Sequence, residues 1–318
     1  MPLQTPPPIQ APAPVQASPD RDLAFPGFNG HPLRASVRAA SGHPYFAVMV
    51  AGSGPTDRNW SNPLMPASYA GRDLARWLAG QGIGSLRYDK RFIGSKDPTL
   101  DISLDAQAGD IRAALAAARA LPEAKGRKLL LVGHSEGALL SLLCWDQADA
   151  LLLLEPPARS MAKTIQAQLA LQLPVDTAKA NLDYMESVFA AIRAGQPTPA
   201  AGKDVYPALE RLARSLMARE SLGFVRATLD LDPLALAQRA GVPCAITWGE
   251  KDVQTWKPEA LPAGFRVPVL ELPAANHLLK REPRPRAGLN GANAASAYGD
   301  DTPMADLAPL RDWLKTLK

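Results

Sequence analysis

The chain has 318 residues, of which 47% are hydrophobic, and its formal net charge is +4 at pH 7. This length and apolar content allow one large domain or two small ones with a sizeable buried core. The small net charge gives no reason to expect a nucleic acid or an anionic membrane as a partner, and no apolar run approaches the ~20 residues that span a bilayer.

Residues 1–20 form a lead that contains seven prolines and no apolar core. This composition predicts an extended, disordered segment and not a secretion signal. Two locations stay open: the cytoplasm for the chain as written, and the periplasm or the exterior if a signal has been removed ahead of the lead.

Short strands then alternate with helices. Strands are predicted at 33–39, 45–51, 83–88, 128–133 and 150–154, and helices at 67–81, 104–121 and 138–147. Most of these strands are apolar along their whole length, which is typical of a parallel sheet covered by helices on both faces. The fold class is therefore α/β, with a mostly parallel central sheet.

The alternation stops between residues 160 and 239, where only helical patterns occur. It resumes in two strands and a last helix, at 243–248, 267–272 and about 305–317. We therefore predict an α/β core, residues 21–157 and 240–318, interrupted by a helical insertion at 158–239. The insertion leaves the core at the carboxyl edge of the sheet, where ligand crevices lie, so we expect a cap over the site. Further helical packing is the alternative.

Neither a metal nor a nucleotide cofactor is expected. The sequence has no His-Glu-x-x-His, no paired Cys-x-x-Cys, no phosphate-binding loop and no dinucleotide fingerprint. Cys144 and Cys244 each lie in an apolar stretch and are predicted to be buried thiols. The chemistry is expected to rest on the protein's own groups, without a cofactor.

Ser135 lies between a predicted buried strand and a predicted helix. Four apolar residues precede Gly-His-Ser-Glu-Gly at 133–137. A serine at such a strand-to-helix turn is held in a strained backbone conformation with its hydroxyl raised above the sheet edge, and small flanking residues let strand and helix approach. We predict that Ser135 is a nucleophile, with an ordinary tight turn as the alternative.

A serine nucleophile needs a base, and histidine is the usual one. Of the four histidines, His31 and His43 lie before or at the first strands of the core. His134 is adjacent to Ser135, and neighbouring side chains on a sharp turn point apart. His277 remains, in a loop directly after a predicted strand, and is the predicted base. A surface histidine is the alternative.

The base in turn needs an orienting acid. Asp252 is the predicted acid, because it follows the strand at 243–248 and so comes from the same edge of the sheet. Glu250 is the alternative acid. For both Asp252 and Glu250, the other interpretation is a solvated loop carboxylate without a catalytic role.

The reaction also needs donors for a developing oxyanion. One is the backbone N–H of Glu136, directly after the nucleophile. The second is expected from the glycine-rich loop after the strand at 45–51, where the N–H of Ser53 is the prediction and that of Gly54 the alternative. A plain glycine-rich turn is the other interpretation of this loop.

Taken together, these motifs resemble the α/β-hydrolase superfamily. Within it, the chain is similar to a bacterial esterase group with five spaced motifs: Gly-Ser-Gly-Pro-x-Asp-Arg at 52–58, Arg-Tyr-Asp-Lys-Arg at 87–91, Gly-His-Ser-x-Gly at 133–137, Gly-Glu-Lys-Asp at 249–252 and Asn-His at 276–277. The order Ser, Asp, His along the chain is also that of the superfamily. The resemblance covers about residues 25–318. It implies an α/β-hydrolase fold with a helical cap and a cofactor-free carboxylesterase for short acyl chains.

Two departures from the group stand out. Phe92-Ile93-Gly94 follows Arg91 where Gly-x-Gly is more usual, and the segment 281–303 between the predicted base and the last helix is long.

The predicted function is that of a serine carboxylesterase that hydrolyses a small-molecule, short-chain acyl ester through an acyl-enzyme. Ser135, His277 and Asp252 are the predicted catalytic residues, and Ser53 and Glu136 supply the oxyanion donors. A thioesterase, an acyltransferase or a peptidase with the same side chains is the alternative. A second alternative is a protein with a hydrolase-like fold that only binds a ligand.

Further residues have structural interpretations. Asp57 and Arg58 are expected to hold the oxyanion loop through an ion pair, with Asp89 or Arg91 as a partner. Nine apolar side chains of the insertion are expected either to pack the cap on itself or to line an acyl pocket: Met161, Ile165, Leu169, Tyr184, Met185, Phe189, Leu216, Met217 and Phe224.

Overall fold

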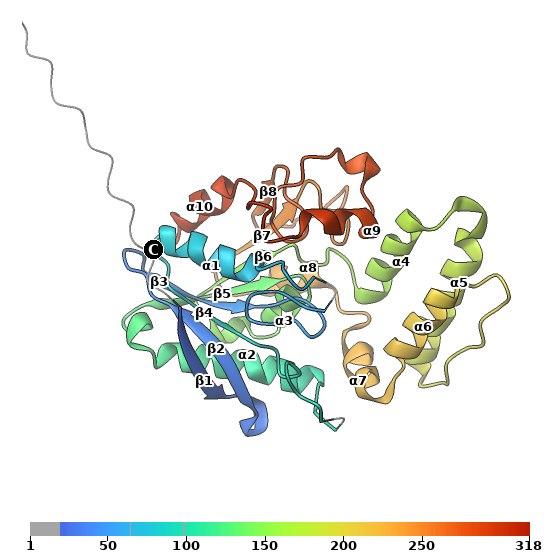
Figure 1. Ribbon diagram of the computed structural model, residues 1–318, viewed down its shortest axis with the longest axis horizontal. Helices are drawn as coiled ribbons and strands as arrows, with labels where there is room; N and C mark the ends of the chain where they lie inside the picture. The colour runs from blue at the N-terminus through green and yellow to red at the C-terminus, as the bar shows by residue number, and fades with distance from the viewer. Residues whose placement is uncertain (1–19, 64, 98) are drawn as a thin grey trace, which may run out of the picture.

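The structure is a computed structural model that describes residues 20–63, 65–97 and 99–318 (Figure 1). The lead predicted over residues 1–20 therefore lies, apart from Asp20, outside the described residues. None of the helices in the described part is both long and apolar enough to cross a membrane.

In the described part of the chain, eight strands form one sheet in the order β1-β2-β4-β3-β5-β6-β7-β8. They are β1 (Arg21–Pro26), β2 (Pro32–Arg38), β3 (Tyr45–Val50), β4 (Ser85–Tyr88), β5 (Lys128–His134), β6 (Ala150–Leu154), β7 (Cys244–Gly249) and β8 (Val269–Leu272). β1, β2 and β4 pair antiparallel at one edge, whereas β4, β3 and β5 to β8 pair in parallel. The predicted mostly parallel sheet is confirmed.

The sequence did not reveal β1. Of its six residues only Phe25 is buried, because β1 is the edge strand and much of it faces solvent. An edge strand therefore lacks the continuous apolar run that marks a central parallel strand.

Helices cover both faces of the sheet. They are α1 (Ala70–Gly80), α2 (Leu104–Arg119), α3 (Glu136–Leu142), α4 (Met161–Gln172), α5 (Val175–Ala194), α6 (Pro207–Leu216), α7 (Arg219–Thr228), α8 (Pro233–Arg239), α9 (Gly291–Ala294) and α10 (Ala308–Leu314). In β5, Leu129 and Leu131 pack in the cluster that holds α2, α3 and α8, whereas Leu130 and Val132 pack with α1 and α10. This alternation follows from the two-residue period of a strand and explains why these strands are apolar throughout.

The helix predicted at 138–147 is shorter than expected. α3 ends at Leu142, where the N–H groups of Leu143 and Cys144 bond to carbonyls three residues back. This tightens the last turn, and a separate 3₁₀ turn follows at Trp145–Gln147.

Helices α4 to α7 gather beside the sheet, at the right of Figure 1. They enclose an apolar cluster of their own, whose largest buried members include Met185, Phe189 and Ile192. α8 instead packs back on the sheet, since Leu234 and Ala237 lie in the same cluster as Ile246 of β7. Between β6 and β7 the described chain contains α4 to α8 and no strand.

Candidate active site

The turn between β5 and α3 holds Ser135 in a strained conformation. Its backbone has φ 53° and ψ −123°, in the left-handed half of conformational space that non-glycine residues rarely adopt. Two backbone bonds fix it there: Ser135 N–H donates to the Leu154 carbonyl of β6 at 2.9 Å, and its carbonyl accepts from Ala138 N–H at 2.9 Å. The side chain is therefore presented at the carboxyl edge of the sheet.

The two glycines of the motif are required by close approach. A Cβ on Gly133 would lie 2.5 Å from the Gly137 carbonyl oxygen and 2.5 Å from Ser141 Oγ, both in α3. A Cβ on Gly137 would lie 2.4 Å from the Ala51 oxygen and 2.6 Å from the Val50 oxygen at the end of β3. The motif thus lets β3, β5 and α3 converge under the serine.

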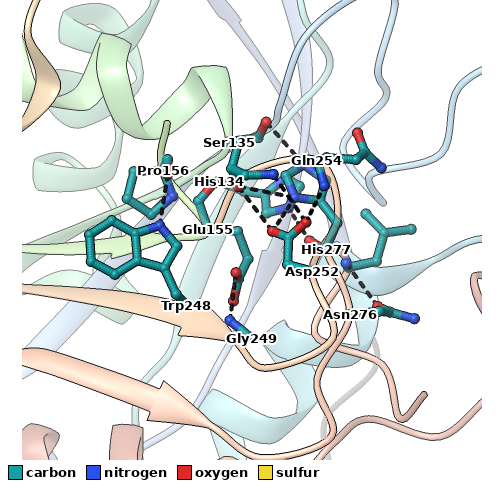
Figure 2. A network of polar contacts seen from close by, with 12 residues as sticks. His134, Ser135, Glu155, Pro156, Trp248, Gly249, Asp252, Gln254, Asn276 and His277 are labelled. Carbon is teal, nitrogen blue, oxygen red and sulfur yellow. Dashed lines mark hydrogen bonds and ion pairs between the residues drawn. The ribbon is translucent and has the colours of Figure 1, made fainter. Parts of the chain in front are cut away.

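Three side chains from different strand ends meet at this turn (Figure 2). His277 Nε2 lies 3.1 Å from Ser135 Oγ, and His277 Nδ1 lies 2.8 Å from Asp252 Oδ2. All three residues are buried, Asp252 completely. A carboxylate can only accept, so Nδ1 carries the proton and Nε2 is free to accept from the serine hydroxyl.

The Asp252 carboxylate is held by its own loop. Its Oδ1 accepts the N–H groups of Gln254 at 2.7 Å and Thr255 at 3.1 Å, and the Thr255 hydroxyl lies 2.9 Å from Oδ2. Burial by itself would raise the pKa of Asp252, but His277 and these hydrogen bonds outweigh it and the pKa is lowered. The group therefore stays ionised.

Glu250, the alternative acid, points elsewhere. Its Oε1 lies 2.7 Å from Lys251 Nζ, and its Oε2 accepts Ala274 N–H at 3.3 Å. The bond to Lys251 lowers the pKa of this exposed carboxyl. The structure brings Asp252, and not Glu250, to His277.

His134 does not contact the Ser135 hydroxyl but supports the His277 loop. Its Nε2 donates to the His277 carbonyl at 2.7 Å, and its ring stacks on Trp60 with 4.8 Å between centroids. Burial, together with the nearby His277, lowers the pKa of His134 to about 3, so the ring is neutral. This role could not be predicted from the sequence, because both contacts join residues that are distant in the chain.

A second buried carboxyl, Glu155, lies beside Asp252. It follows β6 with φ 47°, and its Oε2 accepts Gly249 N–H at 2.8 Å (Figure 2). Burial and the charge of Asp252 raise the pKa of Glu155 well above its usual value, which favours its protonated form. Sequence reasoning missed this residue, since Glu-Pro-Pro after a strand indicates only a turn.

Ser53, one of the two expected oxyanion donors, lines a small cavity beside Ser135. It has a volume of about 40 Å³, and its lining includes Ser53, Ser135 and His277. Within the described part of the chain, no partner accepts from the backbone N–H of Glu136 or of Ser53. Both are therefore available to an added oxygen. The N–H of Gly54, the alternative donor, has no such partner either.

The loop after β3 is held by polar contacts. Arg58 Nη2 lies 3.1 Å from Asp89 Oδ2, which is the predicted ion pair. Arg91 pairs instead with Asp110, at 2.7 Å. Asp57 makes no ion pair in the described structure, and its carboxylate accepts backbone N–H groups of its own turn. The expectation of an Arg58 anchor holds, whereas Arg91 and Asp57 have other partners.

The residues that line the cavity come from the end of β5 and from the loops after β3, β5, β7 and β8, and none comes from α4 to α8. Tyr184, Met185 and Phe189 are buried in the cluster of the helical segment, and Phe224 packs with the sheet. For Tyr184, Met185 and Phe189 the expected packing within the helical segment holds, whereas Phe224 packs in the cluster of the sheet and does not line the cavity. Among the described residues, no group of three or more His, Cys, Asp or Glu side chains is arranged to hold a metal ion.

The sheet and the strained serine turn define an α/β-hydrolase fold. The chain belongs to the family described as the alpha/beta hydrolase family, whose sequence profile matches residues 47–289. No curated protein matches the chain.

Several solved structures share the fold at low sequence identity. An esterase of Pyrococcus furiosus, Pf2001, is 13% identical, with 94% of this chain and 91% of that chain covered and a TM-score of 0.55. DcsB, in complex with its substrate analogue, is 16% identical, with 94% of this chain and 99% of that chain covered and a TM-score of 0.53. The hypothetical protein PA2218 of Pseudomonas aeruginosa is 14% identical, with 91% of this chain and 95% of that chain covered and a TM-score of 0.52.

Proposed function

We propose that the protein is a serine carboxylesterase of the capped bacterial group, acting on small esters with short acyl chains. The observation that carries the proposal is the continuous contact from Ser135 Oγ through His277 to Asp252, at 3.1 and 2.8 Å. A strained serine, a neutral acceptor nitrogen and a buried carboxylate are together what activates a hydroxyl at neutral pH.

In the proposed reaction, Ser135 Oγ attacks the ester carbonyl while His277 Nε2 takes the hydroxyl proton. The N–H groups of Glu136 and Ser53 bind the oxyanion. His277 then gives the proton to the leaving alcohol, and the acyl group stays on Ser135. A water attacks this acyl-enzyme with His277 again as base, which releases the acid. Asp252 holds the imidazole in the required tautomer and stabilises its cation.

The cavity supports a short acyl group. Its volume of about 40 Å³ is bounded by Trp60, Met65 and Leu278 beside the serine. A short acyl group fits this space, and a longer chain would have to extend beyond it. We therefore expect activity to fall as the acyl group is lengthened.

We also assign α4 to α7 the role of a cap. One contact supports it: Gln168 Nε2 of α4 donates to the Gln254 carbonyl at 2.7 Å. Gln254 belongs to the Asp252 loop and lines the cavity. α4 thus lies against the loop that carries the proposed acid, although the cavity wall itself comes from the core.

The test is hydrolysis of a series of p-nitrophenyl esters by the wild type and by Ser135→Ala. We expect the variant to lose at least about 10³-fold in kcat, because the nucleophile acts as a unit with its base. Ser296→Ala, an exposed serine distant in the chain, is the matched control. A fluorophosphonate probe should label the wild type and not Ser135→Ala. Turnover by Ser135→Ala within tenfold of wild type contradicts the proposal.

The same assay identifies the acceptor. If an added alcohol or amine competes with water for the acyl-enzyme, the protein is a transferase; if thioesters or peptides react faster than oxygen esters, the natural bond is of that kind.

A further inference from the structure

Lys90 is buried between two segments that carry the proposed oxyanion donors. It follows β4, and its side chain is 5% exposed. Its Nζ donates to the Gly52 carbonyl at 3.0 Å and lies 2.8 Å from Glu136 Oε1. One ammonium group thus joins the loop after β3 to the first turn of α3.

The bond to Gly52 fixes a direction as well as a distance. The Gly52 carbonyl and the Ser53 N–H belong to the same planar trans peptide group, so they point in opposite directions. When Lys90 holds the carbonyl oxygen, it also sets where the Ser53 N–H points. Without Lys90 no other described group bonds to this oxygen, and the peptide plane is free to rotate.

The next peptide group along the loop has its own holder. The Thr56 hydroxyl donates to the Ser53 carbonyl at 2.7 Å. By the same geometry, this bond sets the direction of the Gly54 N–H. The two possible second donors, Ser53 and Gly54, are therefore oriented by two different side chains.

The second contact of Lys90 explains why a charged group is present. A buried ammonium without a counter-charge is costly, and Glu136 supplies that charge from a side chain that is 19% exposed. An ammonium also has three donors on one atom, which lets it reach a carbonyl and a carboxylate at once. The ion pair therefore keeps the donor on Gly52 in place.

We propose that Lys90 is a positioning residue for the esterase reaction, which orients the Ser53 N–H toward the substrate oxyanion by holding the Gly52 carbonyl. This role rests on the proposed function, since it requires an acyl transfer at Ser135. It does not involve proton transfer by Lys90.

The test compares Lys90→Met with Thr56→Val, two near-isosteric changes that each release one peptide group of the same loop. kcat is measured on p-nitrophenyl acetate and divided by the number of active sites titrated with a fluorophosphonate. Loss of one oxyanion donor costs about 10²–10³-fold, and a donor that is misaligned but present should cost less. We therefore expect Lys90→Met to lose about 10- to 100-fold in kcat per site with little change in KM, and Thr56→Val to lose less than about threefold.

Two further variants cover a failure of Lys90→Met to fold. Glu136→Leu removes the counter-charge but keeps the backbone donor, and we expect a smaller kcat loss of the same kind. Lys90→Arg keeps a cationic donor and should recover part of the activity lost in Lys90→Met. A merely structural role would lower the number of labelled sites and leave kcat per site unchanged.

Three results overturn the inference. If both Lys90→Met and Glu136→Leu keep the wild-type kcat per site, then Lys90 does not orient the Ser53 N–H for catalysis. A larger loss in Thr56→Val than in Lys90→Met assigns the second donor to Gly54. A wild type that neither reacts with the probe nor hydrolyses esters contradicts the proposed function itself, and the Lys90 role with it, before any variant is compared.

Discussion

The carboxyl edge of the sheet and the helical segment α4 to α7 differ in whether their charged side chains are buried or exposed. At the edge, the charged groups of Lys90 and Asp252 are buried, and each is bonded to another group. In the helical segment the largest buried side chains are apolar, and ion pairs such as Arg193–Asp230 lie at the surface, with side chains 41% and 57% exposed.

Backbone strain is divided in the same way. Ser135 and Glu155 have positive φ at two neighbouring strand ends, whereas no described non-glycine residue of α4 to α8 does. Burying charge and straining the backbone both reduce stability. Both features occur at this edge and are absent from the described helical segment, which indicates where the fold gives up stability for chemistry. The following four predictions test that difference.

The largest effect is expected for Asp252→Asn. An amide in this place holds the wrong imidazole tautomer, and such a change lowers kcat by about 10⁴-fold while the geometry survives. Glu250→Gln, two residues away, should keep kcat within about twofold of the wild type, because this exposed carboxylate does not contact His277. The assay is hydrolysis of p-nitrophenyl acetate with circular dichroism as a check of folding. An Asn variant with more than a tenth of the wild-type kcat would remove Asp252 from the mechanism.

The second prediction concerns the pH dependence of stability. The pKa of His134 is lowered to about 3 in the folded protein. The unfolded chain binds a proton near pH 6.5 that the folded protein does not bind, so the free energy of unfolding falls as the pH is lowered from 6.5 toward 3. The expected slope from this group is about 1.4 kcal/mol per pH unit.

His134→Gln removes the titrating group and should reduce that slope. Urea unfolding of both proteins between pH 4 and pH 7 measures it. Parallel curves for variant and wild type would show that His134 titrates normally in the fold.

The third prediction compares a glycine at the edge with one in the helical segment. Gly137→Ala places a Cβ 2.4 Å from the backbone oxygen of Ala51, directly after β3, and should destabilise the fold by about 3 kcal/mol. Gly223→Ala in α7 meets nothing within 4 Å and should stabilise it by about 0.5–1 kcal/mol, because alanine favours a helix. Urea unfolding at neutral pH checks both, and equal signs would contradict the comparison.

The smallest effect is expected for Asp230→Asn in the helical segment. Arg193 lies 2.8 Å from Asp230, but both side chains are exposed, so the ion pair contributes about 0–1 kcal/mol. kcat should not change. A loss of more than about 2 kcal/mol in thermal unfolding would show that the surface of this segment matters more than its exposure indicates.

Much of the sheet and the positions of the proposed catalytic groups could be predicted from the sequence. Central parallel strands are apolar runs, and each is followed by the loop where chemistry-bearing side chains appear, so Ser135, Asp252 and His277 stand out. β1 did not stand out, because only one of its residues is buried.

The supporting residues could not be predicted for a different reason. Lys90 meets Glu136 across 46 positions of the sequence, and Glu155 meets Gly249 across 94. Lys90 lies in the Arg-Tyr-Asp-Lys-Arg motif, but the motif does not say which groups its side chain meets, and Glu155 lies in a plain turn sequence. The role of each follows only from neighbours that the folded sheet supplies. The apolar residues of the insertion show the same limit, since a helical stripe does not say whether a side chain such as Phe224 faces its own segment or the sheet.

The wide separation of the catalytic groups also bears on how the protein acquires activity. Ser135 and His277 are 142 positions apart, and α4 to α8 lie between the strands that carry them. Contacts of such long range form slowly, after local helices. During refolding from denaturant, the far-ultraviolet helix signal should therefore return first. Turnover should return only when β7 and β8 have docked, so regained activity reports the last step of assembly.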